Sequence, residues 1–110
     1  MRESHSAVIA RNERWEGTAA TEPYEAGWAS EAIVFVRALS LTGGGPATAR
    51  VQISPDGMHW ADEGTYFELP HAPDGVTFAR LRDFGNWIRI MAELPEGHAI
   101  TVLVTISLKE

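Results

Sequence analysis

Histidines and carboxylates are the side chains of this 110-residue sequence best suited to acid–base or metal chemistry. Four histidines occur, and no two of them have the i, i+2 or i, i+4 spacing of a compact metal site: His5, His59, His71 and His98. His59 stands beside Trp60, and strand alternation would turn it towards solvent. The histidines therefore predict no metal site and no catalytic base.

The acidic residues Asp56, Asp62 and Glu63 form the one cluster of oxygen ligands that could coordinate calcium. The cluster lacks the dense alternation of carboxylates seen in a recognised calcium loop, so a solvated turn is the competing interpretation. A glycosidase needs a facing pair of carboxylates, but nothing among the fifteen acidic residues selects one.

Motifs for nucleophilic or phosphate chemistry are missing from the sequence. It has no Gly-x-Ser-x-Gly, no His-Glu-x-x-His and no cysteine. The glycines of residues 43–45 lack the Lys and Ser/Thr of a phosphate-binding loop. We therefore expect a protein that is not an enzyme and that needs no cofactor.

The string Ser54-x-Asp56-Gly57-x-x-Trp60 is the most distinctive motif, and it has the chemistry of a turn. The Asp56 carboxylate can accept backbone N–H groups across the turn, and Gly57 can adopt a positive φ. Trp60 would then pack back on the preceding strand. We interpret these four residues as a structural turn motif.

Tryptophan and arginine supply the candidate interface or ligand residues: Trp15, Trp28, Arg80, Arg82, Trp87 and Arg89. Eight of the nine basic residues are Arg, which favours paired, planar contacts at interfaces. Arg80, Arg82 and Arg89 lie on or beside consecutive predicted strands, and alternation places Phe78 with the first two. Each Trp could instead fill the core.

Hydrophobic residues recur with a period of two, which predicts the strands that must position these side chains. Residues 47–54 and 100–108 alternate, residues 76–81 and 87–94 give two more strands, and shorter candidates lie at 8–11, 18–21, 58–61 and 65–68. Residues 32–41 are apolar on both sides, as in a central strand or one facing a partner.

The predicted fold is all-β: one antiparallel β-sandwich over residues 1–110, jelly-roll-like, with about seven to nine strands and little or no helix. Residues 1–29 are the least regular and could form an N-terminal arm. A jelly roll and an immunoglobulin-like topology remain alternatives. Gly43 to Pro46 reads as a flexible connection, and Asp56-Gly57 and Asp74-Gly75 as turns in which Gly takes positive φ.

Two segments together resemble discoidin-like (F5/8 type C) β-sandwich modules. They are Val51 to Trp60, which ends in the turn motif, and the strand Asn86 to Ile90. The resemblance spans residues 47–94 and implies a jelly roll used mainly for binding glycans or lipid surfaces. The loops that carry ligand specificity in that family cannot be placed in this sequence, so no ligand residue carries over.

The formal net charge is −6, which disfavours a general nucleic-acid binder and docking on an anionic membrane. We find no signal peptide and no apolar run long enough to span a bilayer, and therefore expect no membrane insertion. The compartment is unknown; the chain would be cytoplasmic as synthesised or virion-associated.

Two functions follow from these patterns. The first is a non-catalytic structural protein: a self-associating β-sandwich subunit, such as a virion accessory or decoration protein or a shell or filament component. Its partners would be further copies or a larger protein assembly. The alternative is a module that binds a carbohydrate or another ligand, with exposed Trp side chains stacking on sugar rings.

Overall fold

Nine β-strands make up the regular structure in the computed structural model, which describes residues 3–43 and 46–110. They are β1 (Ser4–Trp15), β2 (Thr18–Ala20), β3 (Tyr24–Glu25), β4 (Glu31–Thr42), β5 (Thr48–Ser54), β6 (Ala61–Glu68), β7 (Val76–Arg82), β8 (Trp87–Glu93) and β9 (Ala99–Lys109). None of the described residues is helical, as predicted. A membrane-spanning helix is accordingly not found in these ranges.

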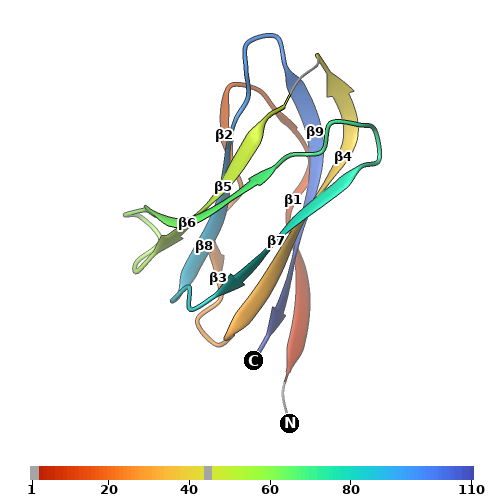
Figure 1. Ribbon diagram of the computed structural model, residues 1–110. Coiled ribbons are helices and arrows are strands. Elements are labelled where there is room, and N and C mark those ends of the chain that lie inside the picture. Colours follow the sequence, from red (N-terminus) through yellow and green to blue (C-terminus); the bar gives the residue numbers. More distant parts are fainter. Residues whose placement is uncertain (1–2, 44–45) are drawn as a thin grey trace.

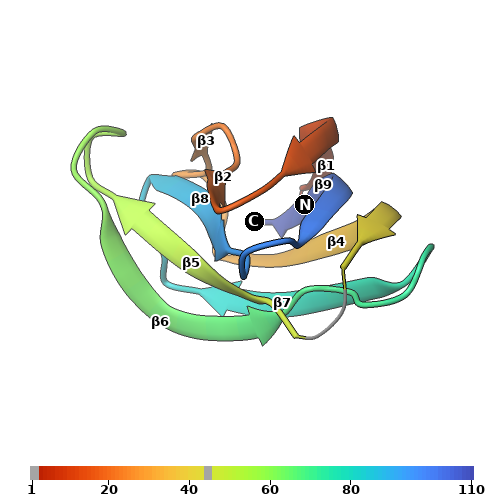
Figure 2. The same cartoon turned by 90° about the horizontal axis from the view of Figure 1, so that it is seen from above.

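Two antiparallel sheets face each other (Figures 1 and 2). The first sheet has the order β1-β9-β4-β7, and the second has the order β2-β8-β5-β6 with the short β3 also pairing with β8. Each sheet therefore has one face towards the other sheet and one outer face, which confirms the predicted β-sandwich.

The strand pairs are nested along the chain. The first strand pairs with the last, β2 and β3 pair with β8, β4 pairs with β7, and β5 pairs with β6. One long antiparallel hairpin rolled into two sheets gives this pattern, which is the jelly roll. The topology thus selects the jelly roll over the immunoglobulin-like alternative.

The core between the sheets follows from the period of two. Alternate residues of β9 are buried from Ile100 to Leu108, and Ile88 and Ile90 of β8 are fully buried opposite them. On β4 the buried series is Ala32, Val34, Val36 and Ala38. The intervening β4 residues point outwards, so the second apolar side of this strand lies on the surface of the first sheet.

The N-terminal segment does not form an arm. Residues 4–15 pair with β9 along its length, and residues 18–25 supply the two short strands beside β8. The register of β1 shifts between Val8 and Ala10 and again between Arg11 and Glu13, and Asn12 has a φ of 53°. These bulges interrupt the alternation, which is why the sequence looked irregular there.

One of the two predicted Asp-Gly turns has a different backbone conformation from the one expected. Gly57 has a φ of 81°, as expected, but at the second Asp-Gly turn Asp74 takes the positive φ of 62°. Gly75 is required for space, because a Cβ there would lie 2.9 Å from the carbonyl oxygen of Ala72. Residues 58–60 of the strand predicted at 58–61 lie in the β5–β6 turn, and Ala61 begins β6. The expected flexible connection includes residues 44 and 45, which lie outside the described residues.

Candidate functional site

The outer face of the first sheet carries a group of apolar side chains that crosses all four strands. Phe35 of β4 lies between Phe78 of β7 and Thr105 of β9, and Thr105 is followed by Val8 of β1. We call the following outward-facing residues the apolar patch: Val8, Ile33, Phe35, Val76, Phe78 and Leu103. The patch is the surface counterpart of the two-sided apolar strand predicted at 32–41.

The patch is accessible to solvent at the β7 edge. Val76 is 54% exposed and Phe78 is 46% exposed, whereas Phe35 is half-buried beside them. The rings of Phe35 and Phe78 lie 6.1 Å apart at an interplanar angle of 40°, so they support each other. Apolar side chains gathered on one face of a folded chain are typical of an interaction surface.

Arginines surround the apolar patch. The guanidinium of Arg80 lies 5.0 Å from the centre of the Phe78 ring, a cation–π distance. Arg37 is paired with Asp74 at 2.8 Å, and Arg82 with Glu31 at 3.0 Å. Arg80 and Arg82, both candidate interface residues, therefore lie at the rim of the patch.

The second sheet has a different outer face, built around a polar network. The Gln52 amide donates to Asp62 at 2.9 Å and accepts from Arg89 Nε at 2.8 Å. Arg50 donates to Glu93 at 3.0 Å, and its Nε lies 3.2 Å from Asp62 Oδ1. Most of these polar groups are paired within the network, while Arg50 Nε is buried and makes no hydrogen bond. The dense pairing suits a structural network better than a reactive site.

Arg89 belongs to this network and not to the apolar patch. Strands β7 and β8 are consecutive in the chain but lie in different sheets, so Arg80 and Arg89 are on opposite outer faces. The Arg89 guanidinium lies 4.4 Å from the centre of the Trp60 ring, and burial lowers the pKa of this group. Trp60 thus packs against Arg89 of β8.

The turn motif performs the predicted backbone role. Asp56 Oδ1 accepts the backbone N–H groups of Met58 at 2.8 Å and His59 at 2.9 Å. Ser54 Oγ accepts the backbone N–H of Gly57 at 2.8 Å and donates to Asp56 at 3.0 Å. His59 is exposed, and its Nδ1 lies 2.6 Å from Asp56 Oδ2.

Replacing Asp56 with Asn should reduce the loss of stability of the protein at acid pH. Hydrogen bonds from the backbone N–H groups of His59 and Met58 hold the pKa of the Asp56 carboxyl well below its usual value. A lowered folded-state pKa means that the stabilisation is present above about pH 4 and is lost as the pH falls below it. Urea unfolding at pH 7 and pH 3 should show a smaller acid loss for Asp56→Asn than for the wild type.

Asp83→Asn, on the β7–β8 turn, is the matched control and should keep the wild-type pH profile. An unchanged acid loss in Asp56→Asn would contradict the assigned role of this carboxylate.

The same turn covers Trp87. A Cβ added at Gly57 would meet the Trp87 ring at 3.3 Å, so the glycine lets the backbone pass close to the indole. Trp87 is half-buried on the outer face of the second sheet, opposite Ser54. Its ring is therefore part of the packing of the turn motif.

The two remaining tryptophans, Trp15 and Trp28, differ in their exposure to solvent. Trp15 is only 2% exposed, and its indole N–H donates to Glu13 at 3.3 Å. It belongs to the core, which corrects its place among the accessible interface candidates. Trp28, in the turn between β3 and β4, is 40% exposed and remains accessible.

No metal centre emerges from the described ranges, because no three His, Asp or Glu side chains are grouped to hold an ion. Asp62 is engaged by Arg50 and Gln52, and Glu63 accepts from the Thr65 hydroxyl and backbone N–H. Asp56 is occupied by its own turn. The calcium interpretation of these three residues thus has no geometric support.

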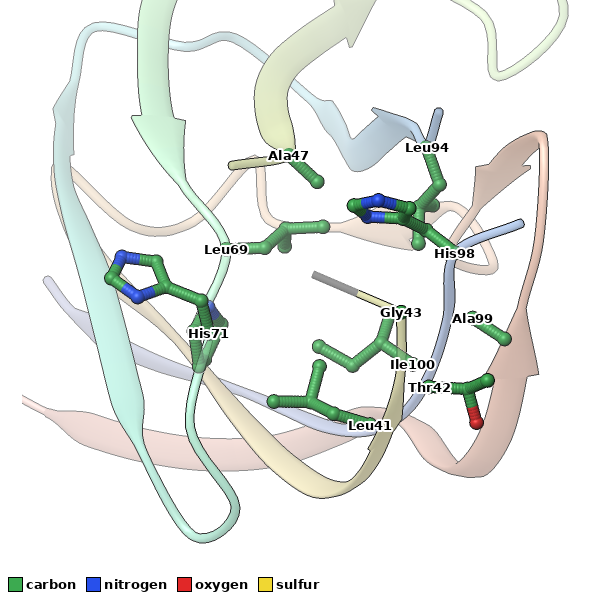
Figure 3. Close-up of a pocket in the computed structure, with 11 residues that line it drawn as sticks. Leu41, Thr42, Gly43, Ala47, Leu69, His71, Leu94, His98, Ala99 and Ile100 are labelled. Carbon is green, nitrogen blue, oxygen red and sulfur yellow. The ribbon is translucent and has the colours of Figure 1, made fainter. Parts of the chain in front are cut away.

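A small cavity of about 40 Å³ lies at the end of the sandwich near the β8–β9 turn (Figure 3). Its wall is mainly apolar, with Leu41, Leu69 and Ile100 pointing into it and His98 at its upper edge. His71 points away from the centre (Figure 3). The volume suits one or two water molecules and not a substrate.

Opposite charges separate onto the two sheets. The strands of the first sheet contain six Lys or Arg and two Glu: Arg11, Arg14, Arg37, Arg80, Arg82 and Lys109 against Glu13 and Glu31. The strands of the second sheet contain two Arg, Arg50 and Arg89, and five acidic residues: Glu25, Asp62, Glu63, Glu68 and Glu93. The rest of the chain contains one Arg and eight acidic residues, so the net charge of −6 comes mainly from residues outside the strands.

Sequence reasoning missed most of the apolar patch. It singled out Arg80 and Arg82 at the rim but not Phe35, Val8 or Leu103. The available signal was the pair Ile33 and Phe35, which faces outwards once Val34 and Val36 are assigned to the core.

Comparison with known proteins identifies the fold. No protein-family model and no curated protein sequence matches the chain, so the discoidin resemblance has no family-level support. Solved structures do match. The SPBc2 prophage-derived protein YomS is 8% identical with a TM-score of 0.62, and the match covers 100% of this chain and 96% of that one.

Two further matches have similar scores. A chain of infectious bursal disease virus, strain Gx, is 10% identical with a TM-score of 0.60; the match covers all of this chain and 32% of the viral one. A structure of Bacillus endospore appendages that form disulfide-linked pili is 14% identical with a TM-score of 0.52. The match covers 99% of this chain and 83% of that one. At these identities the likeness establishes an all-β jelly-roll sandwich and no more.

Proposed function

We propose that this protein is a non-catalytic structural subunit that associates with further copies of itself through the outer face of its first sheet. The observation that carries the proposal is the apolar patch, in which Phe78 and Val76 are about half exposed on strand β7. Burying such a patch against a partner removes apolar surface from water, which is the main driving force of association.

The surroundings of the patch support association rather than catalysis. Its centre is aromatic and aliphatic and its rim carries arginines, which is the composition of a protein–protein interface. The fold is also compatible, because the structural neighbours include a virus and endospore pili, and a prophage-derived protein matches over its length. A virion accessory, shell or filament component is the specific role that we favour.

The carbohydrate-binding alternative rests on the discoidin-like pattern and on the tryptophans. A stacking platform needs an open aromatic face. Trp15 is buried, one face of Trp60 lies against Arg89, and Trp87 is covered by the β5–β6 turn. Trp28 is left as the accessible indole, which makes the alternative the weaker one.

Size-exclusion chromatography with light scattering, over a hundredfold range of protein concentration, tests the proposal. We expect a mass that is a multiple of 12.1 kDa at the upper concentrations. A monomer at every concentration would contradict self-association as the function of the patch.

A further inference from the structure

We propose that the copies associate front to back: the apolar patch of one copy docks on an acidic corner of the second sheet of the next copy. The acidic corner consists of Tyr66 and Glu68 on β6 and Glu93 on β8. This inference rests on the proposed function, because it names the surface that the apolar patch meets.

The face that carries the apolar patch is cationic as well as apolar. Beside the apolar patch lies a hollow lined by Ile33, Arg80, Arg82, Ser107 and Lys109, with Glu31 at its wall. Three basic side chains thus meet a single acidic one, and Glu31 is already paired with Arg82 at 3.0 Å. Such a hollow favours a partner that brings carboxylates.

The acidic corner is complementary to this face, because it is acidic and aromatic. Tyr66 is 59% exposed, and the side chains of Glu68 and Glu93 are 66% and 61% exposed. A shallow hollow beside Tyr66 is lined by Thr48, Arg50 and Glu93 and opens on the same face. It offers an aromatic contact for Phe78. Its carboxylates already have neighbours, since Glu93 is paired with Arg50 at 3.0 Å and Glu68 lies 3.6 Å from His71, but both remain exposed on one side to a further cation.

Like charge disfavours the other simple arrangement, in which two apolar patches meet across a twofold axis. Arg37 and Arg82 are paired with Asp74 and Glu31, but that arrangement would bring Arg80 of both copies into one interface, where facing like charges are destabilising. The strands of the first sheet carry six basic and two acidic residues, while those of the second carry two and five. Charge complementarity therefore selects the second sheet as the partner surface.

The arrangement predicts the form of the assembly. The two surfaces lie on the outer faces of different sheets, with Phe78 and Tyr66 on the neighbouring edge strands β7 and β6, so a docked copy leaves one of each free (Figure 2). Such a heterologous contact repeats from copy to copy, and it yields a ring when the rotation closes and a filament when it does not.

Mixing two association-defective variants tests the inference. The front variant is Phe78→Glu, and the back variant is Tyr66→Lys with Glu68→Lys; all three side chains are exposed, so the fold should persist and circular dichroism can verify it. Val76→Glu is a second front variant. Met58→Lys with Glu96→Lys matches the charge change of the back variant on two exposed turns.

We expect the front and back variants each to be monomeric, with at least a tenfold loss of association, and their equimolar mixture to form a 1:1 dimer. The dimer forms because the intact acidic corner of the front variant meets the intact apolar patch of the back variant. The matched control should associate like the wild type.

The failures are distinguishable. A back variant that associates like the wild type, or a mixture that stays monomeric, would overturn the front-to-back arrangement and leave the proposed function in place. A front variant that associates like the wild type would instead overturn the proposed function. A patch-to-patch dimer would survive in the back variant alone and would tighten as salt is added, whereas the front-to-back contact should weaken.

Discussion

Trp15→Ala is expected to lower the free energy of unfolding by about 3–5 kcal/mol, the range for truncating a fully buried aromatic side chain. Trp15 is 2% exposed and lies on β1 opposite Ile100 of β9. Its removal would leave a cavity between the sheets and an unpaired Glu13, which now accepts the indole N–H at 3.3 Å. Urea unfolding followed by circular dichroism measures the change.

Trp28→Ala is the matched control for this prediction. Trp28 is 40% exposed in the turn between β3 and β4, so its truncation should cost about 1 kcal/mol or less. Equal losses for the two variants would contradict the assignment of Trp15 to the core and of Trp28 to the surface.

The strands could be predicted where one face of a strand is exposed to solvent and the other is buried in the core. Residues 100–108 alternate because Val102 and Val104 enter the core while Thr101 and Thr105 face outwards. In β1 the same rule fails, because two bulges move the register and leave residues such as Asn12 with a positive φ. A bulge has no strong signature in a single sequence, since many residue types can occupy it.

The candidate site was harder to predict than the fold. Alternation correctly groups Phe78, Arg80 and Arg82 on one face of β7, but it does not say in which sheet β8 lies. The chain crosses from the first sheet to the second between Arg82 and Trp87, which separates Arg80 from Arg89. Which residues share a face is a property of the topology, and local periodicity does not contain it.

Net charge was misleading for a related reason. A value of −6 describes an acidic protein, yet the strands of the first sheet carry an excess of basic residues. Partner preference depends on the charge of the face that is presented. In this chain the strands of the two sheets differ in sign, and the negative net charge comes mainly from residues outside the strands, so the net charge predicts the character of neither face.

Phe78→Glu is the second large expected effect, and it acts on association instead of stability. Phe78 is 46% exposed, stacks against Phe35 and supports the Arg80 guanidinium at 5.0 Å. Central aromatic residues of interfaces commonly contribute about 2 kcal/mol or more, which corresponds to about a thirtyfold change in the association constant. A buried, unpaired carboxylate would add to that loss.

Met58→Glu provides the control, because Met58 is 74% exposed on the β5–β6 turn, outside the apolar patch. It introduces the same side chain at an exposed apolar position. We expect Met58→Glu to associate like the wild type and to unfold at a similar urea concentration.

Sedimentation equilibrium of the wild type, Phe78→Glu and Met58→Glu at matched concentrations tests the central claim most directly, because it yields the association constants of folded protein in solution. The account predicts a multimer for the wild type and Met58→Glu and a monomer for Phe78→Glu. The same association constant for all three proteins would contradict it, because the outer face of the first sheet would then not be the surface through which the copies meet.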